Sequence, residues 1–199
     1  MKNHLIITGI SGCGKSTIIR SVLGGALSCA GGFITEREFS PGANTPAFSI
    51  YHAAAAADKS GFEGKCFLDL SQESPKHNNE VFRTFGVRLL KESENYPFIL
   101  IDEFGGFEIL IPEFREELLK VLSSPRPLIA VLKSAQNAEE LRRRVGLGEK
   151  YTALLQNLHS ALSQNANTEL IEMRCRGEER VSNTLKCWME ENIKSYKAI

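Results

Sequence analysis

The residues with the clearest chemical signal form one short stretch near the start of the chain. Residues 9–16 read GISGCGKS and fit the phosphate-binding loop pattern GxxxxGK[ST] at every fixed position. The glycines allow the backbone to wrap closely around phosphate oxygens, with several amide N–H groups pointing inward. Lys15 supplies a mobile positive charge for the β- and γ-phosphates, and Ser16 offers a hydroxyl to Mg²⁺. We therefore expect the phosphates of a nucleoside triphosphate to contact Gly9, Ile10, Ser11, Gly12, Cys13, Gly14, Lys15, Ser16 and Thr17.

A second candidate is the acidic pair Asp102-Glu103, which follows the apolar run Phe98–Ile101. If that run is a strand of a parallel sheet, the pair lies at the carboxyl edge where such sheets bind ligands. Asp102 is then placed to hold Mg²⁺, through water, and Glu103 can orient and deprotonate an attacking water. The alternative is a helix-capping or solvated acidic pair.

The elements around the phosphate loop have the order that the motif requires. His4–Thr8 is a short apolar run that suits a buried parallel strand, and a helical pattern begins at Lys15 and stops at Gly24-Gly25. The positive N-terminal end of that helix would face the same anion as the loop. A strand, a glycine-rich turn and a helix in this order support phosphate binding over a plain turn.

The rest of the chain alternates between apolar runs and helical patterns. We predict strands at Gly32–Glu36, Lys65–Leu70, Phe98–Ile101, Leu128–Leu132 and Glu169–Met173. We predict helices over 76–92, 112–122, Leu154–Leu162 and Val181–Ile193, and Trp188 in the last of these is a core residue. A further helix begins at the capping pair of Asn137 with Glu140 and ends near Gly146. The pattern predicts a single α/β domain over residues 1–199, a three-layer P-loop NTPase fold with a mainly parallel sheet.

Residues 37–70 are the least regular part of the chain. Turn chemistry in Ser40–Pro46 and alternation at Phe48 and Ile50 predict a hairpin-rich insertion beside the main sheet. This stretch is also the expected surface for a protein partner.

Composition excludes several classes of protein. Lys plus Arg and Asp plus Glu each number 24, so no net charge favours nucleic acid or an anionic membrane, although a local basic patch stays open. No apolar run approaches the 18 or so residues of a membrane span, and the apolar run before Gly9 is too short for a signal peptide. Five scattered cysteines without a CxxC pair favour reduced thiols in the cytoplasm. The sequence makes no prediction of oligomeric state.

Three segments together resemble the small cancer-related nucleoside-triphosphatase family. They are the loop Gly9–Thr17, the segment Gly32–Glu36 (GFITE), which resembles the family's Gly-Phe-any-Thr-Glu strand, and Ile101–Glu108 (IDEFGGFE), which resembles its Asp-Glu-Ile-Gly-Lys-Met-Glu segment. The resemblance covers most of the chain. It implies Mg²⁺-dependent hydrolysis of the terminal phosphate of ATP, GTP and other nucleoside triphosphates with little base preference, and a RecA-like or AAA-like sheet order.

The resemblance also assigns site residues. Lys15, Ser16, Asp102 and Glu103 keep the family's roles, and Glu108 matches its acidic residue. The chain departs at Gly106, where the family usually has Lys, and at Phe104 and Phe107, where it has aliphatic residues. If that Lys acts near the phosphates, its absence affects the hydrolytic rate.

A few further residues have two interpretations each. Thr35 with Glu36 either approaches the γ-phosphate or Mg²⁺, or belongs to an ordinary strand. Arg142–Arg144 either supply an arginine to the transition state or form a solvated helix face, and Lys133 is a second candidate cation. Cys13 is either a reactive thiol or a small filler in the loop.

Three other functions remain compatible with the loop. Residues 102–105 satisfy the DxxG pattern of a GTPase switch, but Lys133–Gln136 lacks the Asp of a guanine reader, which disfavours that function. A small-molecule or nucleotide kinase would share the loop and Asp102, and would need an acceptor pocket and an arginine-rich lid. A nucleotide-dependent switch with slow hydrolysis would act on a partner protein.

Overall fold

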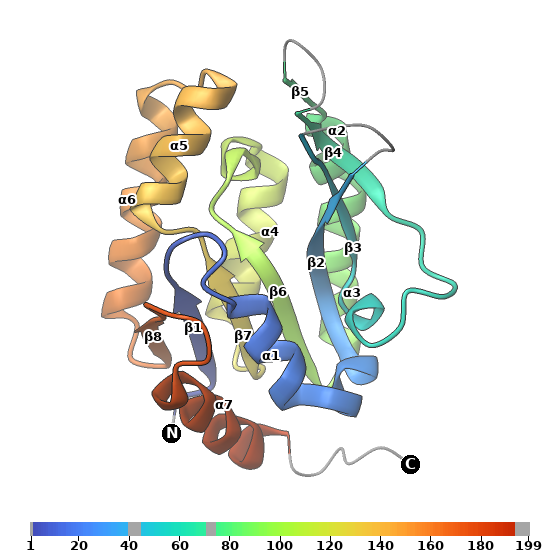
Figure 1. Cartoon of the computed structure of the whole chain (residues 1–199), viewed down its shortest axis with the longest axis vertical. Helices are drawn as coiled ribbons and strands as arrows, with labels where there is room; N and C mark the ends of the chain where they lie inside the picture. The colour runs from blue at the N-terminus through green and yellow to red at the C-terminus, as the bar shows by residue number, and fades with distance from the viewer. Residues whose placement is uncertain (1, 40–44, 71–74, 194–199) are drawn as a thin grey trace.

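The structure is a computed structural model that describes residues 2–39, 45–70 and 75–193. One eight-stranded sheet runs through the molecule in the order β5-β4-β3-β2-β6-β7-β1-β8, with helices on both of its faces (Figure 1). The predicted three-layer fold with a mainly parallel sheet is therefore confirmed.

Five strands form the parallel part of the sheet, and their bounds are β1 His4–Thr8, β2 Ala30–Glu38, β6 Phe98–Phe104, β7 Leu128–Leu132 and β8 Thr168–Glu172. β1 pairs with β7 on one side and β8 on the other, and β6 pairs with β7 and β2. Thus β7 separates the strand before the phosphate loop from the strand that carries Asp102, in agreement with the RecA-like or AAA-like order that the resemblance implies. All five carboxyl ends meet at one edge of the sheet.

Three antiparallel strands continue the sheet beyond β2. They are β3 Ala47–His52, β4 Lys65–Asp69 and the short β5 Lys76–His77. The hairpin-rich character of the insertion is confirmed, but its predicted place beside the sheet is wrong. β2 extends to Glu38, past the predicted end at Glu36, and pairs with β3 as far as Ala47, so the hairpins belong to the sheet itself. The turn chemistry predicted for Ser40–Pro46 falls largely outside the described residues.

The helices cover the two faces of the sheet (Figure 1). α1 Lys15–Leu23 and α7 Glu179–Asn192 pack together on one face. The other face carries α3 Val87–Glu92, α4 Pro112–Ser123 and α6 Glu149–Gln164. α5 Ala135–Val145 rises above the carboxyl ends of the strands, opposite the β3–β4 hairpin (Figure 1).

Two other predicted boundaries are wrong by three residues each, and β8 is displaced by one residue from the predicted Glu169–Met173. The helix predicted over 76–92 begins only at Asn79, because the Asn78 side chain accepts the Glu80 N–H and caps the first turn, α2 Asn79–Val81. A π-helical segment, Phe82–Gly86, then joins α2 to α3. The strand predicted to end at Ile101 continues through the acidic pair to Phe104.

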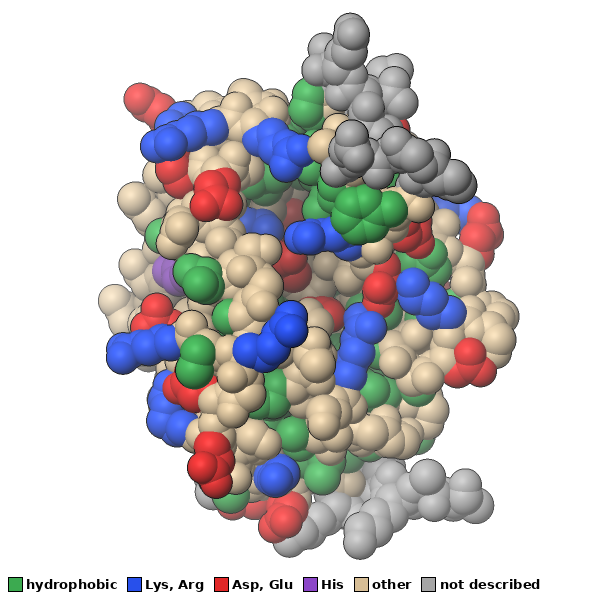
Figure 2. All heavy atoms as spheres, viewed as in Figure 1, with side chains coloured by type: hydrophobic (Ala, Val, Ile, Leu, Met, Phe, Trp, Pro, Cys, Tyr) green, Lys and Arg blue, Asp and Glu red, His purple; other side chains and the backbone are tan. Residues whose placement is uncertain are grey.

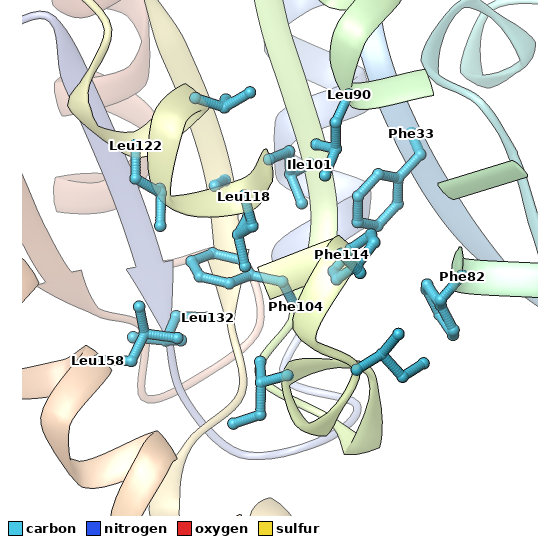
Figure 3. Close-up of a cluster of buried hydrophobic side chains, with 14 of the residues drawn as sticks. Phe33, Phe82, Leu90, Ile101, Phe104, Phe114, Leu118, Leu122, Leu132 and Leu158 are labelled. Atoms are coloured by element: carbon cyan, nitrogen blue, oxygen red, sulfur yellow. The ribbon is translucent and has the colours of Figure 1, made fainter. Parts of the chain in front are cut away.

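Apolar side chains fill the space on both sides of the sheet. On the α3–α4–α6 face the rings of Phe82 and Phe33 pack against Phe114, with centroids 5.0 and 5.9 Å away, in the aromatic group that Figure 3 shows. Full burial of each such ring stabilises the fold by roughly 1.5–3 kcal/mol. On the other face Trp188 is buried, as predicted, and its indole N–H donates to the Asn3 carbonyl at 3.1 Å.

The surface matches the neutral composition. Figure 2 shows acidic and basic side chains intermixed over one face of the molecule, without a large area of a single sign. Within the described ranges, no helix has the length and apolar character needed to cross a bilayer.

Candidate active site

The phosphate loop joins β1 to α1 at the carboxyl edge of the sheet. Its backbone has positive φ at Gly9 (143°), Gly12 (78°) and Gly14 (98°). A methyl group added at Gly9 would lie 2.2 Å from the Met173 carbonyl oxygen, so the close approach of the loop to the end of β8 requires glycine. The glycines of the motif are therefore explained by the backbone conformation of the loop and, at Gly9, by its close packing against β8.

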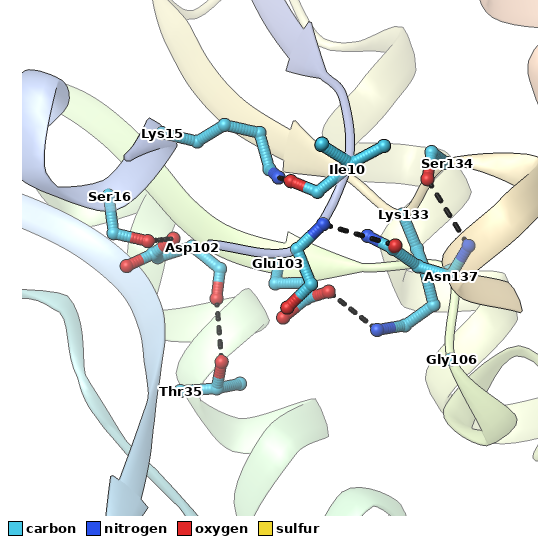
Figure 4. A network of polar contacts seen from close by, with 12 residues as sticks. Ile10, Lys15, Ser16, Thr35, Asp102, Glu103, Gly106, Lys133, Ser134 and Asn137 are labelled. Atoms are coloured by element: carbon cyan, nitrogen blue, oxygen red, sulfur yellow. Dashed lines mark hydrogen bonds and ion pairs between the residues drawn. The ribbon is translucent and has the colours of Figure 1, made fainter. Parts of the chain in front are cut away.

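Lys15 begins α1 and its side chain folds back across the loop. Its ammonium donates to the carbonyl oxygens of Gly9 and Ile10, both at 2.8 Å (Figure 4). The Sγ of buried Cys13 lies 3.6 Å from the same ammonium. The positive charge is therefore held over the concave side of the loop, where phosphate oxygens bind in such loops.

Ser16 and Asp102 meet directly. The Ser16 hydroxyl donates to Asp102 Oδ1 at 2.8 Å, which joins α1 to β6 across the intervening strand (Figure 4). Asp102 is buried, and burial raises its pKa to about 6 against the opposing effects of Ser16 and the Arg20 guanidinium. Arg20 Nη2 lies 3.6 Å from Asp102 Oδ2 and 2.5 Å from Glu36 Oε1.

This pair suits a Mg²⁺ ion that is shared with phosphate oxygens. Mg²⁺ takes oxygen ligands, and in nucleotide sites it uses one or two protein oxygens besides waters and phosphates. Ser16 and Asp102 are the two side chains that could supply those oxygens here, and a cation beside the buried Asp102 carboxylate would offset the burial that raises its pKa. The described part of the chain holds no group of three or more His, Cys, Asp or Glu residues that would bind a metal without phosphate.

Glu103 has an unusual backbone. Its φ is 76°, a left-handed conformation, and the β6–β7 register shifts between Ile101 and Phe104. Bulges of this kind redirect a side chain at the end of a strand. Burial alone would raise the pKa of Glu103, but the Lys133 ammonium, with smaller effects of Lys15 and Arg37, lowers it overall.

Lys133 follows β7 and pairs with Glu103, Nζ to Oε1, at 2.5 Å (Figure 4). The interpretation of Lys133 as a cation near the site is therefore supported by its position. Thr35 lies there too, because its hydroxyl donates to the backbone carbonyl of Asp102 at 3.1 Å. Glu36, by contrast, points to Arg20 and to Lys59.

Asn137 has a different role from the one predicted. The cap of α5 is Ser134, whose hydroxyl accepts the Asn137 N–H, so the predicted capping pair of Asn137 with Glu140 is wrong. The Asn137 side chain instead accepts the Ser11 N–H at 3.1 Å and donates to the Gly9 carbonyl at 3.3 Å. It therefore fixes the start of α5 against the phosphate loop (Figure 4).

Two arginines that the sequence analysis did not select line the phosphate site. Arg37 lies two residues after Thr35 in β2, and alternation along a strand places both on one face. Arg176 lies in the segment between β8 and α7, where its Cγ would be 3.4 Å from a methyl group at Gly14. The spacing from Thr35 is a usable signal for Arg37; nothing in the sequence indicates Arg176.

The three arginines at 142–144 do not share one role: two form a solvated helix face, and the third lies near the site. Arg142 and Arg143 both bind Glu139, and hydrogen bonds from these guanidinium groups lower the pKa of Glu139 to about 2. They belong to the outer face of α5. Arg144 instead lines the hollow beside Glu103.

The departure at Gly106 has a local explanation. The buried Glu108 carboxylate accepts the N–H groups of Gly105 and Gly106 at 2.6 and 2.8 Å, and burial raises the pKa of Glu108. A Cβ at position 106 would lie 2.6 Å from Glu108 Oε2. A side chain at position 106 would therefore require the Glu108 carboxylate to shift from its observed position.

Comparison with known sequences agrees with this geometry. The family model described as NTPase matches residues 4–165. The nucleoside-triphosphatase THEP1 of Thermotoga maritima is 30% identical over 145 residues, which cover 70% of this chain and 80% of the relative. The THEP1 of Methanosarcina barkeri is 27% identical over 144 residues, covering 70% and 82%.

Two solved structures share the fold. The crystal structure of THEP1 from Aquifex aeolicus aligns with a TM-score of 0.59 at 18% identity, covering 92% of this chain and 96% of that one. The solution structure of a human cancer-related nucleoside triphosphatase aligns with a TM-score of 0.58 at 17% identity, covering 98% and 99%.

Proposed function

Since the chain belongs to the NTPase family and is a nucleoside-triphosphatase, we propose that its reaction is the Mg²⁺-dependent hydrolysis of the terminal phosphate of ATP, GTP and other nucleoside triphosphates. The observation that carries this proposal is the hydrogen bond from Ser16 to Asp102, with Glu103 next to it. This contact joins the phosphate loop to the strand that carries Glu103, which supports assigning metal binding to Ser16 and Asp102 and water activation to Glu103.

The proposed roles follow from charge and position. Lys15 and the loop N–H groups hold the β- and γ-phosphates and offset negative charge that shifts toward the leaving oxygen. The carboxylate of Glu103 is ionised, because its pKa is lowered, and it accepts a proton from the attacking water. Ser16 and Asp102 would hold Mg²⁺, which supplies charge neutralisation on the phosphate oxygens when bound.

Arg37 and Arg176 extend the positive charge around the loop. We assign Arg37, near Glu103, to the γ-phosphate side. We assign Arg176, which packs at Gly14 near exposed Thr17, to the nucleoside side. A guanidinium plane can stack on any base, which supports low base selectivity.

Phosphate release from ATP, GTP, CTP and UTP tests this proposal. We expect all four nucleotides to be hydrolysed with kcat/KM values within about tenfold, because one wrong base contact is worth roughly 1–3 kcal/mol and an exposed stacking arginine supplies none. Activity should disappear with EDTA and return with Mg²⁺. In the Ser16→Ala variant the Mg²⁺ concentration needed for half-maximal rate should rise. Hydrolysis of one nucleotide alone, or full activity in EDTA, would contradict the proposal.

A specific observation favours a second candidate, phosphoryl transfer to a small acceptor. An apolar hollow opens beside Glu103, and Arg144 lies at its edge. In such a reaction an acceptor hydroxyl would replace water at Glu103. The two reactions differ in their products: hydrolysis releases one inorganic phosphate for each nucleoside diphosphate formed, and transfer releases none.

We further propose a cytoplasmic location, a single domain over residues 1–199 and a protein-partner surface on residues 37–70. The five cysteines are all unpaired thiols, which suits a reducing compartment. The pairing of β2, β3 and β4 within the one sheet supports a single domain. Nucleic acid binding is not part of the proposal, since positive and negative residues balance.

A further inference from the structure

A second hollow adjoins the phosphate site on the side of Glu103. Ser11, Arg37 and Glu103 line both the phosphate site and this hollow, so the two share a wall. Figure 2 shows a depression near the middle of the visible face, with charged side chains around it. We call this second hollow the side pocket.

The walls of the side pocket are largely apolar. The β3–β4 hairpin, the π-helical segment, the loop after β6 and α5 contribute Phe48, Phe67, Leu68, Leu70, Phe82, Phe107 and Leu141. Three of these rings pack on one another: Phe67 lies 4.9 Å from Phe82 and 6.0 Å from Phe107 between centroids. They form a firm aromatic wall suited to a flat apolar body.

Three basic and three acidic side chains line the side pocket, and one of the acidic ones, Glu108, is buried and bonded to backbone N–H groups. At the exposed rim, two arginines lie with one carboxylate. Arg37 and Arg144 are exposed, and neither forms an ion pair with a carboxylate of the described chain. The guanidinium of Arg37 lies over the Phe48 ring, 5.6 Å from its centroid. The Lys133 ammonium is already paired with Glu103, and Glu140 is the one exposed carboxylate among the described lining residues. An apolar body that carries an anionic group would match both features.

We propose that the side pocket binds a small organic anion with an aromatic or aliphatic body, whose anionic group lies on Arg144 while its body contacts the Phe67–Phe82–Phe107 wall. The ligand then lies beside Glu103 and takes the place of water there. This inference rests on the proposed function, because it places the γ-phosphate at Glu103.

The position that we propose for the nucleoside lies outside the side pocket. Glu103 faces the γ-phosphate in the proposed reaction, whereas Arg176 and Thr17 lie at the other end of the loop. A nucleotide held by the loop therefore extends away from the side pocket. The two ligands should bind together rather than compete.

The probe for the test is 1-anilinonaphthalene-8-sulfonate (ANS), a fluorescent aromatic sulfonate. We expect saturable binding of one ANS per folded chain, with or without saturating nucleotide, and slower nucleotide hydrolysis at unchanged KM. Arg144→Gln should weaken ANS binding about tenfold, because a charge-assisted contact is lost. Leu141→Glu, which adds a negative charge to a half-buried wall, should abolish binding.

Arg143→Gln is the matched control, since Arg143 is a neighbour in the same helix that pairs with Glu139 and does not line the side pocket. Its ANS affinity should equal that of the wild type, and circular dichroism and thermal melting should show each variant folded. Lys15→Ala should bind ANS normally while losing nucleotide, which separates failure of this inference from failure of the proposed function. Equal weakening by Arg143→Gln and Arg144→Gln, or displacement of ANS by nucleotide, would overturn the proposal.

Discussion

The left-handed backbone at Glu103 predicts that glycine is more stabilising than alanine at this position, which is the reverse of the usual order in a strand. Among the described residues, Glu103 is the only non-glycine with positive φ, and it is the residue to which we assign the water-activating carboxylate. Strained conformations of this kind persist where the surrounding structure enforces them, and they concentrate at active sites. We compare Glu103→Ala with Glu103→Gly, because both remove the carboxylate and the ion pair with Lys133, and they differ only in the Cβ.

The expected difference follows from two opposing terms. A Cβ in the left-handed region costs roughly 1–2 kcal/mol. Glycine loses about 0.5–1 kcal/mol more on folding than alanine does, because it has more backbone freedom in the unfolded chain. We therefore expect the glycine variant to be more stable than the alanine variant by about 0.7 kcal/mol, a factor of about three in the folding equilibrium.

Urea unfolding of the two variants measures this difference directly. Glu169 in β8 provides a matched pair in a strand with ordinary φ, and there alanine should be the more stable residue by about 0.5–1 kcal/mol. Both Glu103 variants should also lose hydrolysis. If Glu103→Ala proves as stable as Glu103→Gly, the backbone at this residue is not strained and the argument fails.

Three further predictions concern stability and the phosphate loop. Burial lowers the pKa of His4 below its unfolded value of about 6.5, so the unfolded chain binds more protons than the folded chain. The free energy of unfolding should therefore fall as the pH drops below 6.5, by at most about 1.4 kcal/mol per pH unit. His4→Gln should remove this part of the pH dependence when the free energy of unfolding is measured by urea titration. Tyr151→Phe removes a buried O–H that donates to the Gly105 carbonyl at 2.8 Å, and should cost about 1–3 kcal/mol, or several degrees in Tm by calorimetry; an unchanged Tm would show that this hydrogen bond does not stabilise the fold. Asn137→Ala should weaken nucleotide binding on the order of tenfold in a fluorescent-nucleotide titration, and Asn137→Asp should weaken it further because a negative charge would face the phosphates; equal affinity in both variants and the wild type would contradict the contact with the loop.

The parallel core of the fold could be predicted because its signals are local. Each buried strand is a short apolar run, β1 and β7 have the predicted bounds, and α1 begins at the predicted Lys15. The antiparallel strands were harder to place, because alternation in Phe48 and Ile50 indicates a strand but not its partner. Their pairing with β2 depends on contacts between segments that sequence patterns do not specify.

Some residues of the site could likewise be predicted from the sequence, and others could not. Lys15, Ser16 and Asp102 could be found because motif and strand end indicate them, and the structure brings all three together. The role of Asn137 could not be predicted, because a polar residue near a helix start is compatible both with a cap and with a contact across the molecule. Arg176 could not be found, since only the packing of the segment after β8 against the loop places it there.

The central claim is that the phosphate loop binds the nucleotide and Glu103 activates water. The most direct test measures nucleotide binding and phosphate release in parallel for the wild type, Lys15→Ala and Glu103→Gln, with Mg²⁺ present. We expect Lys15→Ala to lose both binding and hydrolysis, whereas Glu103→Gln should bind nucleotide with near wild-type affinity and lose hydrolysis by about 10²–10⁴-fold. Hydrolysis at the wild-type rate in Glu103→Gln would contradict the central claim.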